Sequence, residues 1–330
     1  MKAVVYTEYG PPDVLQIKEV EKPTPNDDEV LVKVEAASVN LSDWEMLRGI
    51  GYARMGGLRK PRRHILGSDI AGRVEAVGKN ITRFAPGDEV FGDILGGMGG
   101  FAEYALARER ALALKPAGIT FEEASAIPQA AVIALQGIRD KAQVKPGHER
   151  QWGAVLINGA GGGAGSLAVQ LAKMHGAEVT GVDNTGKLDF MRSLGADHVI
   201  DYTREDFTRS GKKYDFILDL VAHRSVFDYR RALRSGGSYY AVGGSLGSVI
   251  QILLLGPLIG RIAGKKIGVL IVRSNPEDML HAAELCQAGK IVLHIDRRFS
   301  LNEVPDALRY LGEGRVKGKI VITMGEGTGI

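Results

Sequence analysis

The sequence predicts an α/β fold in which a doubly wound parallel sheet is inserted into a β-rich domain built from both ends of the chain. Short β-branched runs dominate the first 120 residues, and β-type segments return after residue 292. Between them, segments with strand and helix periodicity alternate. We therefore place the β-rich domain at 1–120 and 293–330, and the parallel sheet at 121–292.

Segments typical of strands in the β-rich domain lie at 1–7, 30–36, 69–77, 88–91, 296–300 and 318–323. Pro11 and Pro12 separate the first two, and the glycine-dense stretch 92–100 is typical of a loop. A helix is expected at 304–311, between the last two strands. The end of the chain is therefore expected to rejoin the first domain.

The central part of the chain alternates between the two periodicities. We expect helices at 121–126 and 128–141, strand 154–158, helix 165–175, strand 177–182, helix 186–194, strands 198–200 and 214–218, helix 225–234 and strand 238–242. Thr120 is a suitable N-cap for the first helix. Strands and helices that alternate with short links imply a parallel sheet covered on both faces.

Composition and charge exclude several classes of protein. A net charge of +3 is too small to indicate a nucleic-acid partner or an anionic membrane. The single cysteine, Cys286, cannot form an internal disulfide. The N-terminus has no apolar run of signal-peptide length, and the most apolar window, 249–262, is short for a bilayer span and is interrupted by glycine and proline. We expect a cytoplasmic protein with a small-molecule substrate, no nucleic acid and no membrane.

The most specific motif is the glycine loop, residues 159–165, which follows an apolar strand and opens a helix. Glycine permits positive φ and close approach of the backbone to a pyrophosphate, and the helix N-terminus attracts the anion. This context predicts a Rossmann dinucleotide site, whereas a turn that binds nothing is the alternative. The expected cofactor-binding residues of the loop are Ala160, Gly161, Gly162, Gly163, Ala164 and Gly165.

Three residues beyond the loop bear on the choice between NADH and NADPH. Asp183, at the end of the next strand, would accept a hydrogen bond from a ribose 2′-hydroxyl and repel a 2′-phosphate. Lys187 would instead reach a 2′-phosphate, unless it is a solvated helix lysine. Tyr202 follows the next strand and is expected beside the adenosine. Asp183 favours NADH, and Lys187 and Tyr202 keep NADPH open.

Six different segments occur along the chain in a specific order and spacing: 37–43, 66–78, 86–91, the glycine loop, 194–202 and 318–322. In this order they resemble the medium-chain dehydrogenase/reductase superfamily, in its zinc-independent quinone oxidoreductase and enoyl reductase branch. The resemblance covers nearly the whole chain. It implies a GroES-like catalytic domain with a Rossmann domain inserted, and a cofactor in the cleft between them.

The resemblance also bears on zinc. Zinc alcohol dehydrogenases of this superfamily carry a cysteine in the segment that matches 38–43, and a histidine after the glycine that matches Gly67. Here Asn40 and Ser68 stand at those positions, and neither an amide nor a hydroxyl is a good zinc ligand. We therefore expect an NAD(P)H-dependent oxidoreductase without zinc.

Without a Lewis acid, the expected reaction is hydride transfer to a quinone or an α,β-unsaturated carbonyl, whose oxygen then needs a hydrogen-bond donor. We expect Asn40 to contact the nicotinamide and substrate. The resemblance suggests Tyr52 as the donor, with a packing tyrosine as the alternative. Asp43 is expected to cap the next helix. Arg59, Lys60, Arg62 and Arg63 form either a basic rim of the cleft or a solvated loop.

The apolar segment 245–271 is expected either to line a substrate pocket or to pack in the core, through Leu253, Leu254, Leu255, Leu258 and Ile259. Residues 266–272 are expected to form an edge strand that pairs across the two-fold axis of a homodimer. Two other functions stay open. One is a metal-free alcohol dehydrogenase or ketoreductase, and the other is a non-catalytic dinucleotide-binding redox sensor.

Overall fold

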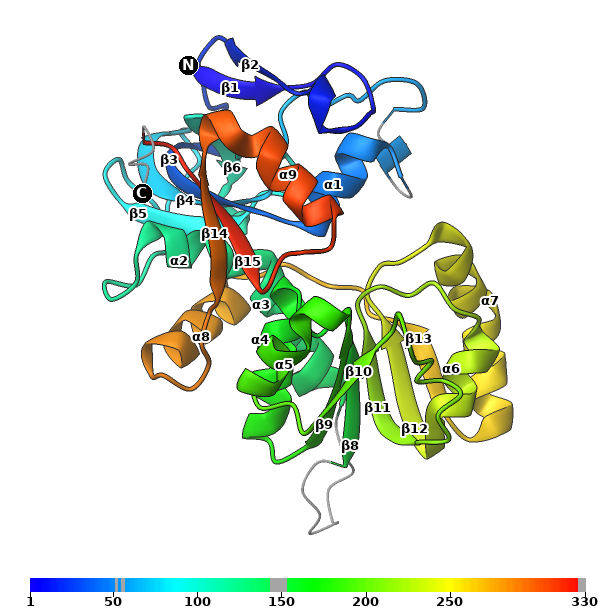
Figure 1. The fold of residues 1–330 in the computed structure, drawn as a ribbon. Helices are drawn as coiled ribbons and strands as arrows, with labels where there is room; N and C mark the ends of the chain where they lie inside the picture. Colours follow the sequence, from blue (N-terminus) through cyan, green and yellow to red (C-terminus); the bar gives the residue numbers. More distant parts are fainter. Residues whose placement is uncertain (51–52, 55–56, 143–152, 326–330) are drawn as a thin grey trace. The chain divides into compact units, whose positions relative to one another are not determined.

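The structure is a computed structural model that describes residues 1–50, 53–54, 57–142 and 153–325 (Figure 1). The chain divides into two compact units. Unit 1 comprises Met1–Gln129, Ser274–Gly289 and Leu293–Ile330, and unit 2 comprises Ala130–Arg273 and Lys290–Val292. The β-rich ends of the chain therefore form one unit, and the alternating central part forms the other.

The main sheet of unit 1 joins strands from both ends of the chain. Among the described residues its order is β14 (Ile295–Ser300), β15 (Lys319–Thr323), β3 (Glu29–Val39), β4 (Asp69–Val77), β5 (Glu89–Asp93) and β7 (Leu112–Leu114), with β6 (Tyr104–Arg108) paired to β3. A separate antiparallel pair contains β1 (Lys2–Val5) and β2 (Gln16–Glu19). Because β15 pairs with β3, the predicted return of the C-terminal segment to the first domain is confirmed.

Among the described residues, four α-helices lie wholly within unit 1: α1 (Leu41–Arg48), α2 (Phe121–Ala126), α8 (Pro276–Gln287) and α9 (Val304–Gly312). Helix α9 buries Val304, Ala307 and Leu308 in the core of this unit, at the spacing of one helix face. The sequence assigns α2 and α8 to the central domain. In the structure they belong to unit 1, because α2 packs against β3 and β4 and α8 packs against β7.

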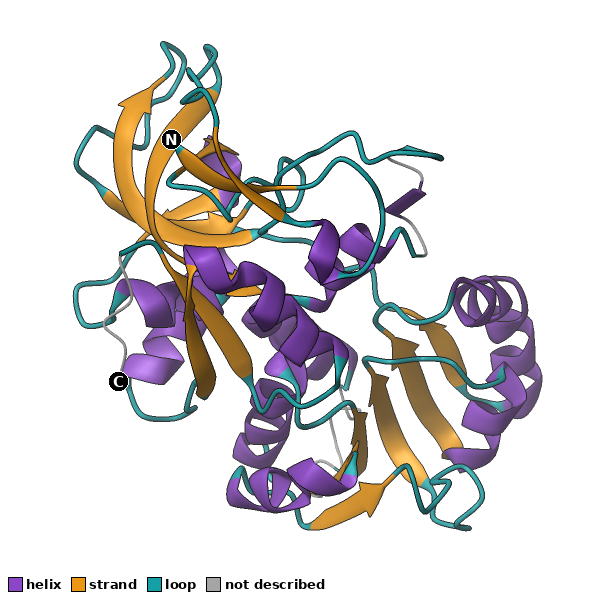
Figure 2. Ribbon diagram, turned by 45° about the horizontal axis from the view of Figure 1, so that its top comes forward, coloured by secondary structure: helices purple, strands orange, loops and turns teal. Residues whose placement is uncertain are grey.

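Unit 2 contains an all-parallel sheet in the Rossmann order. The described strands run β10 (His198–Asp201), β9 (Glu178–Asp183), β8 (Ala154–Asn158), β11 (Tyr214–Asp219), β12 (Leu233–Ala241) and β13 (Lys266–Val269). Helices α4 (Gly163–Met174) and α5 (Leu188–Ser193) lie beside β8–β10, and α6 (Val226–Ala232) and α7 (Leu246–Ala263) lie beside β11–β13 (Figures 1 and 2). Helix α3 (Pro128–Leu135) runs into a π-helix, Gln136–Lys141. The predicted fold class is confirmed.

The central strand β8 explains the position of the predicted cofactor site. All five of its residues are buried, as expected for a parallel strand covered on both faces. Its last residue, Asn158, is in register with Val182 of β9 and Asp219 of β11. The carboxyl ends of these three strands therefore meet at one edge of the sheet, where ligands of doubly wound folds bind.

The segment 245–271 departs from the sequence analysis. Residues 246–263 form one continuous helix, α7, although it contains Pro257. Gly256 and Gly260 are buried against β13, where a Cβ on Gly256 would lie 2.9 Å from the carbonyl oxygen of Ile267. The glycines therefore allow close packing and do not end the helix. The interpretation that these residues pack in the core is wrong for four of them, which are exposed: Leu253, Leu254, Leu255 and Leu258. It is correct for Ile259, which packs against the core of unit 2.

Candidate active site

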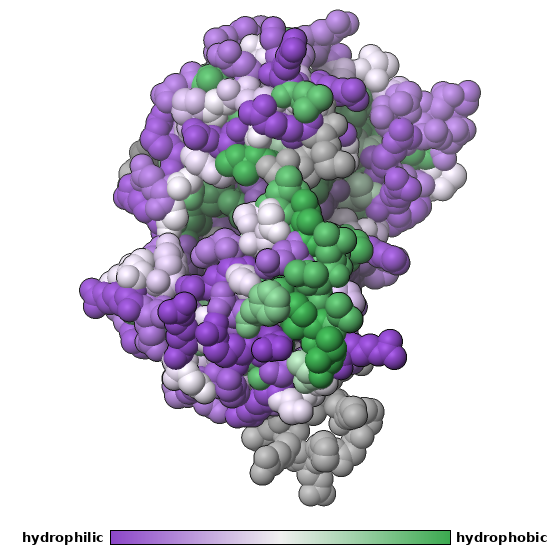
Figure 3. Space-filling view, turned by 90° about the vertical axis from the view of Figure 1, so that its right-hand side faces the viewer, coloured by the Kyte–Doolittle hydropathy of each residue, from purple (hydrophilic) through white to green (hydrophobic). Residues whose placement is uncertain are grey.

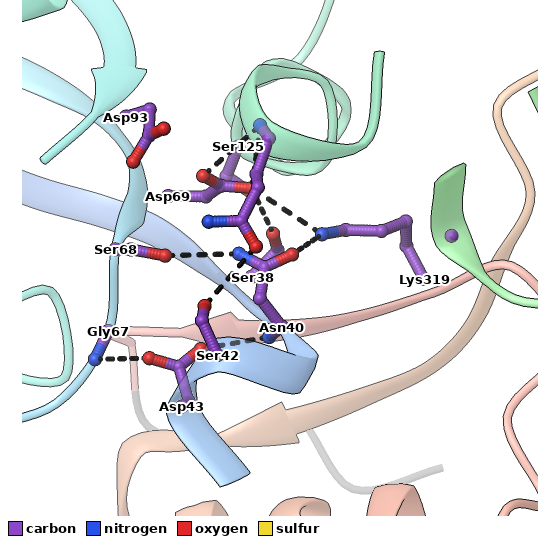
Figure 4. Close-up of polar contacts among 12 residues, drawn as sticks. Ser38, Asn40, Ser42, Asp43, Gly67, Ser68, Asp69, Asp93, Ser125 and Lys319 are labelled. Atoms are coloured by element: carbon purple, nitrogen blue, oxygen red, sulfur yellow. Dashed lines mark hydrogen bonds and ion pairs between the residues drawn. The ribbon is translucent and has the colours of Figure 1, made fainter. Parts of the chain in front are cut away.

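Unit 1 contains a buried group of polar side chains, the polar cluster, which comprises Ser38, Asn40, Asp43, Ser68, Asp69 and Lys319 (Figure 4). The sheet positions several members. Ser38 of β3 lies directly opposite Asp69 of β4, and Lys319 begins β15. Asp93 of β5, outside the cluster, lies opposite Asp69 on its other side. Asn40, between β3 and α1, is 7 % exposed, and the other five are 3 % exposed or less. Burying so many polar groups requires that they satisfy one another.

Lys319 is the cation of the polar cluster. Its Nζ donates a hydrogen bond of 2.6 Å to Oδ1 of Asn40 and lies 3.4 Å from Oδ2 of Asp69. Burial lowers the pKa of Lys319, and the carboxylate of Asp69 opposes that shift. Burial likewise raises the pKa of Asp69, and the charge of Lys319 opposes it. Each group therefore offsets part of the shift that burial causes in the pKa of the other.

The amide of Asn40 is oriented by these neighbours. Its Nδ2 donates to Oγ of Ser68 at 3.2 Å, while Lys319 binds its oxygen. A cationic donor on the oxygen of an amide polarises the group and strengthens its N–H groups as donors. The predicted site residue Asn40 is thus connected to a charge 279 positions away in the sequence.

Asp43 has a structural task, as the sequence predicts. One carboxylate oxygen accepts from the backbone N–H of Asn40 at 2.8 Å, ahead of α1, and the other accepts from that of Gly67 at 2.9 Å. Burial raises the pKa of Asp43 to about 7. Gly67 itself has φ +94°, and a Cβ there would lie 2.6 Å from the backbone nitrogen of Phe101. The predicted capping role of Asp43 is confirmed.

Other predicted residues of unit 1 are less informative. Tyr52 lies outside the described residues, so its role as a donor stays a prediction. Arg59, Lys60 and Arg62 are exposed. Arg63 is also exposed, and it donates hydrogen bonds to the carbonyl oxygens of Leu95 and Gly96. These positions fit the solvated-loop interpretation, and only Arg63 is fixed to a neighbouring loop.

The glycine loop of unit 2 begins with a tight turn. Gly159 has φ +87°, and its N–H and that of Ala160 both donate to the carbonyl oxygen of Val182. The N–H of Gly162 donates to the carbonyl oxygen of Gly159 at 3.2 Å. A Cβ on Gly165 would lie 2.0 Å from that same oxygen, so only glycine allows α4 to pack this closely on the turn.

The structure narrows the set of loop amides that can bind an anion. Helix α4 starts at Gly163, earlier than predicted, and the N–H of Ser166 makes a hydrogen bond to Gly162. The N–H groups of Gly163, Ala164 and Gly165 precede that bond, so they are available to an anion at the helix N-terminus. The predicted binding of a pyrophosphate by backbone N–H groups therefore fits these three residues best. The N–H groups of Ala160, Gly161 and Gly162 already donate hydrogen bonds to other groups of the protein.

Asp183 and Lys187 lie over the glycine loop and bind each other. The carboxylate of Asp183 accepts from the N–H of Gly161 at 2.9 Å and lies 3.2 Å from Nζ of Lys187. Lys187 is buried, so the interpretation of a solvated helix lysine is wrong. Tyr202, in contrast, is 50 % exposed, and its N–H donates to the carbonyl oxygen of Asp183. Asp183 therefore contacts both Lys187 and Tyr202, and the cofactor contacts expected of the three residues stay predictions.

Sequence reasoning missed several charged residues of the interior. Lys319 and Asp69 lie in strands that read as ordinary apolar runs, and Asp219 ends β11. The carboxylate of Asp219 accepts from Asn158 Nδ2 at 2.8 Å and from the hydroxyl of Tyr239 at 3.0 Å. A charged residue inside a predicted buried strand was the available signal, because such residues are almost never buried unless they are paired.

Comparisons with known proteins cover nearly the whole chain. Residues 26–117 match the alcohol dehydrogenase GroES-like domain, and residues 194–322 match the zinc-binding dehydrogenase domain. The chain is 35 % identical to a 2-methylene-furan-3-one reductase of Solanum lycopersicum, over 98 % of this chain and 79 % of that protein. It is 31 % identical to a chloroplastic quinone-oxidoreductase homolog of Spinacia oleracea, over 98 % of each chain. A solved quinone oxidoreductase from Coxiella burnetii superposes with a TM-score of 0.86 at 29 % identity, over 98 % of this chain and 99 % of that one.

Proposed function

Since this chain belongs to the medium-chain dehydrogenase/reductase superfamily, in its quinone oxidoreductase and enoyl reductase branch, we propose that it reduces quinones or α,β-unsaturated carbonyl compounds with a nicotinamide dinucleotide and without a metal. The observation that carries the metal-free part is the contact between Lys319 and Asn40. A buried ammonium already occupies the space between Asn40 and Asp69, and its positive charge opposes a divalent cation there.

The residues of unit 2 fit the cofactor. Gly163, Ala164 and Gly165 offer backbone N–H groups at the start of α4, and Gly162 leaves room, because a Cβ there would meet only the carbonyl oxygen of Gly159, at 3.5 Å. These residues would hold the pyrophosphate. When bound, the cofactor supplies a hydride to an electron-poor carbon of the substrate.

We propose NADH as the preferred cofactor. Asp183 retains acceptor capacity for a ribose hydroxyl, since each carboxylate oxygen has two lone pairs and Gly161 takes one of those on Oδ2. Lys187 is already paired with Asp183, so the pair offers little net charge to a 2′-phosphate. Tyr202, exposed beside them, is suited to pack against the adenosine.

At the substrate, negative charge develops on the carbonyl oxygen as the hydride arrives, and a hydrogen-bond donor must stabilise it. We propose that the Nδ2 group of Asn40 is that donor, strengthened by Lys319 on the other end of the amide. Lys319 then acts as a positioning residue and does not touch the substrate. Asp69, 3.4 Å from Lys319, favours its charged form and opposes the effect of burial.

A turnover assay tests this function. The protein is mixed with NADH or NADPH and a panel of quinones, enones and saturated ketones, and the absorbance of the reduced cofactor is followed. Oxidation driven by quinones or enones supports the proposal. Oxidation driven by ketones alone would indicate a ketoreductase, and binding without turnover would indicate a redox sensor. Loss of activity on chelation, with recovery on adding zinc, would contradict the metal-free mechanism.

We also propose a homodimer that forms through the edge of the sheet of unit 2. In the described part of the chain, β13 pairs with β12 on one side only, and the predicted edge strand at 266–272 is confirmed over Lys266–Val269. A free edge can pair with its own copy across a two-fold axis. Light scattering would measure the mass, and Val269→Pro, which removes a backbone donor that faces away from β12, should shift the protein towards monomer.

A further inference from the structure

Helix α7 has an apolar outer face that no described segment of unit 2 covers. Leu246, Ile250, Leu254, Leu258 and Ile262 recur at every fourth position and are all exposed, with Leu254 at 72 % and Ile262 at 76 %. Leu253 and Leu255 widen this stripe, and the neighbouring helix α6 adds Phe227, which is 51 % exposed. Figure 3 shows a continuous hydrophobic band on this side of the molecule. Isolated exposed leucines are normal, but a contiguous patch of this kind marks an interaction surface.

The opposite face of α7 is fixed to the protein. Ser248, Ile252, Gly256 and Gly260 are buried, and Ile252 belongs to the core of unit 2. Among the described helices, α7 is long and apolar enough to cross a membrane, yet it contains Pro257 and Arg261 and is anchored on β13. A helix that is apolar outside and anchored inside is suited to lie on a surface and not to span it.

Basic side chains gather at the C-terminal end of the stripe. A hollow of about 470 Å³ is lined by Lys213, Phe227, Arg230, Arg231, Ala263 and Lys265. Arg231 is paired with Asp228, whereas Arg230 forms no ion pair with an acidic side chain in the described ranges. Nζ of Lys265 donates only to carbonyl oxygens, those of Arg230 at 2.7 Å and Leu233 at 2.8 Å. This end of the surface therefore carries excess positive charge.

The pKa of Lys265 supports the same conclusion. Partial burial lowers it, and the positive charges of Lys213 and Arg230 lower it further. Neighbouring cations are therefore not neutralised where α7 ends. An anionic group placed in the hollow would relieve this repulsion.

We propose that the outer face of α7 binds the surface of an anionic lipid bilayer, with the apolar stripe inserted among the acyl chains and the basic hollow on a lipid phosphate. Leucine and isoleucine supply the buried apolar area, and cations at the helix end supply the attraction to anionic headgroups. The inference goes beyond the proposed reaction and does not depend on it.

A second copy of the chain fits this surface less well. In an isologous contact the same patch appears on both partners, so the cations of each copy must be met by groups from the same elements. Helix α7 and strand β13 contain no acidic residue, and Asp228 of α6 is already paired with Arg231. Lipid phosphates supply the negative charge that α7 and β13 of a second copy lack.

Vesicle flotation with the full chain tests the proposal. The probes are vesicles of phosphatidylcholine alone and of phosphatidylcholine with phosphatidylglycerol. The wild type is expected to float with the anionic vesicles and to be released at high salt. The variant Leu254→Gln/Leu258→Gln should lower the partition coefficient by about tenfold or more. Arg230→Gln/Lys265→Gln, which removes two cations of the hollow, should remove the preference for phosphatidylglycerol.

The matched control is Leu114→Gln, because Leu114 is 53 % exposed on β7 of unit 1. It should float like the wild type, and thermal melting of each variant checks that the fold is intact. The proposal is overturned if the wild type stays out of the anionic fraction, or if Leu254→Gln/Leu258→Gln floats as well as the wild type. A dimer that dissociates in that variant, without vesicle binding by the wild type, would assign the face to a second copy.

Discussion

The ammonium group of Lys319 lies 2.6 Å from the amide oxygen of Asn40, inside a buried cluster in which Asn40 is the most exposed member, at 7 %. This contact joins the loop before α1 to the start of β15, and Asp69 balances the charge from β4. A positive charge therefore lies behind the one predicted catalytic residue that the structure describes. The first two predictions follow from this arrangement.

Removing Lys319 alone should damage the fold. Lys319→Met leaves Asp69 buried without its partner, which is expected to lower the free energy of unfolding by about 3–5 kcal/mol. The double variant Lys319→Met/Asp69→Asn removes both charges and should recover most of that loss. If the account holds, the double variant binds NADH normally but has kcat lowered by about tenfold. Urea unfolding and steady-state kinetics measure the two effects, and an unchanged kcat would contradict the role of Lys319.

Asn40→Ala should lower kcat much more than it weakens cofactor binding. The variant removes the proposed donor to the substrate oxygen, and such losses are on the order of 10²–10³ in kcat. Ser42→Ala is the matched control, because Ser42 lies two residues away and donates to Gln129 at 3.2 Å. Comparable kinetics for the two variants would exclude Asn40 as the donor.

Two glycines of the loop should respond differently to alanine. Gly165→Ala places a Cβ 2.0 Å from the carbonyl oxygen of Gly159 and should destabilise unit 2. Gly162→Ala meets only ordinary contact at 3.5 Å, so the fold should persist. The Kd for NADH should rise by about tenfold or more, because the added Cβ would lie where we propose that the pyrophosphate binds. Thermal melting and calorimetric titration separate the two outcomes. If a folded Gly162→Ala variant binds NADH with unchanged affinity, the pyrophosphate does not bind beside Gly162.

Asp183→Ser should shift cofactor preference towards NADPH. The substitution removes the carboxylate that repels a 2′-phosphate and releases Lys187 from its ion pair of 3.2 Å. We expect the ratio of kcat/KM for NADPH to that for NADH to rise by roughly 10–100-fold. The double variant Asp183→Ser/Lys187→Met should lose most of this gain. A ratio that does not change in Asp183→Ser would place the ribose away from this residue.

The buried carboxylates predict how stability depends on pH. Burial raises the pKa of Asp93 to about 7, the charge of Asp69 adds to this, and the N–H of Leu95 and the charge of Lys319 oppose it. Below about pH 4 the group is protonated in both states. Protonated Asp93 contributes to the free energy of unfolding, and this contribution is lost as pH rises through 7, because Asp93 ionises at a lower pH in the unfolded chain than in the folded protein. Asp93→Asn should therefore gain stability relative to the wild type between pH 4 and 8, by at most about 1.4 kcal/mol per unit.

Urea unfolding of the two proteins across that range measures the difference. The hydrogen bond from Leu95, 2.9 Å to Oδ1 of Asp93, can be accepted by the asparagine as well. A constant difference between Asp93→Asn and the wild type would mean that Asp93 is ionised in the folded protein throughout.

Much of the fold follows from local patterns in the sequence. The glycine loop, the apolar strand before it and Asp183 lie within one short segment, so spacing alone predicts their meeting. Asn40 and Ser68 were identified by the resemblance, at positions where zinc enzymes carry ligands. Lys319, whose charge lies next to Asn40, comes from the far end of the chain. In the sequence it is only one residue of a short predicted strand, so nothing near it indicates this contact.

Helix α7, for which the sequence analysis predicts no element, shows a second limit of local patterns. Gly256, Pro257 and Gly260 are helix breakers by intrinsic propensity. Tertiary packing overrides this propensity, because the two glycines allow the helix to lie directly on β13. Periodicity alone also cannot tell whether an apolar stripe faces a core or remains outside. The exposure of Leu254 and Leu258 therefore had to come from the structure.

Deuterium transfer is the most direct test of the central claim, hydride transfer without a metal. Chelator-treated protein is incubated with an enone and NADH that carries deuterium in its transferable position at C4. The account predicts full turnover, with the deuterium found on the β-carbon of the reduced product. No turnover until zinc is restored, or a product without deuterium, would contradict it.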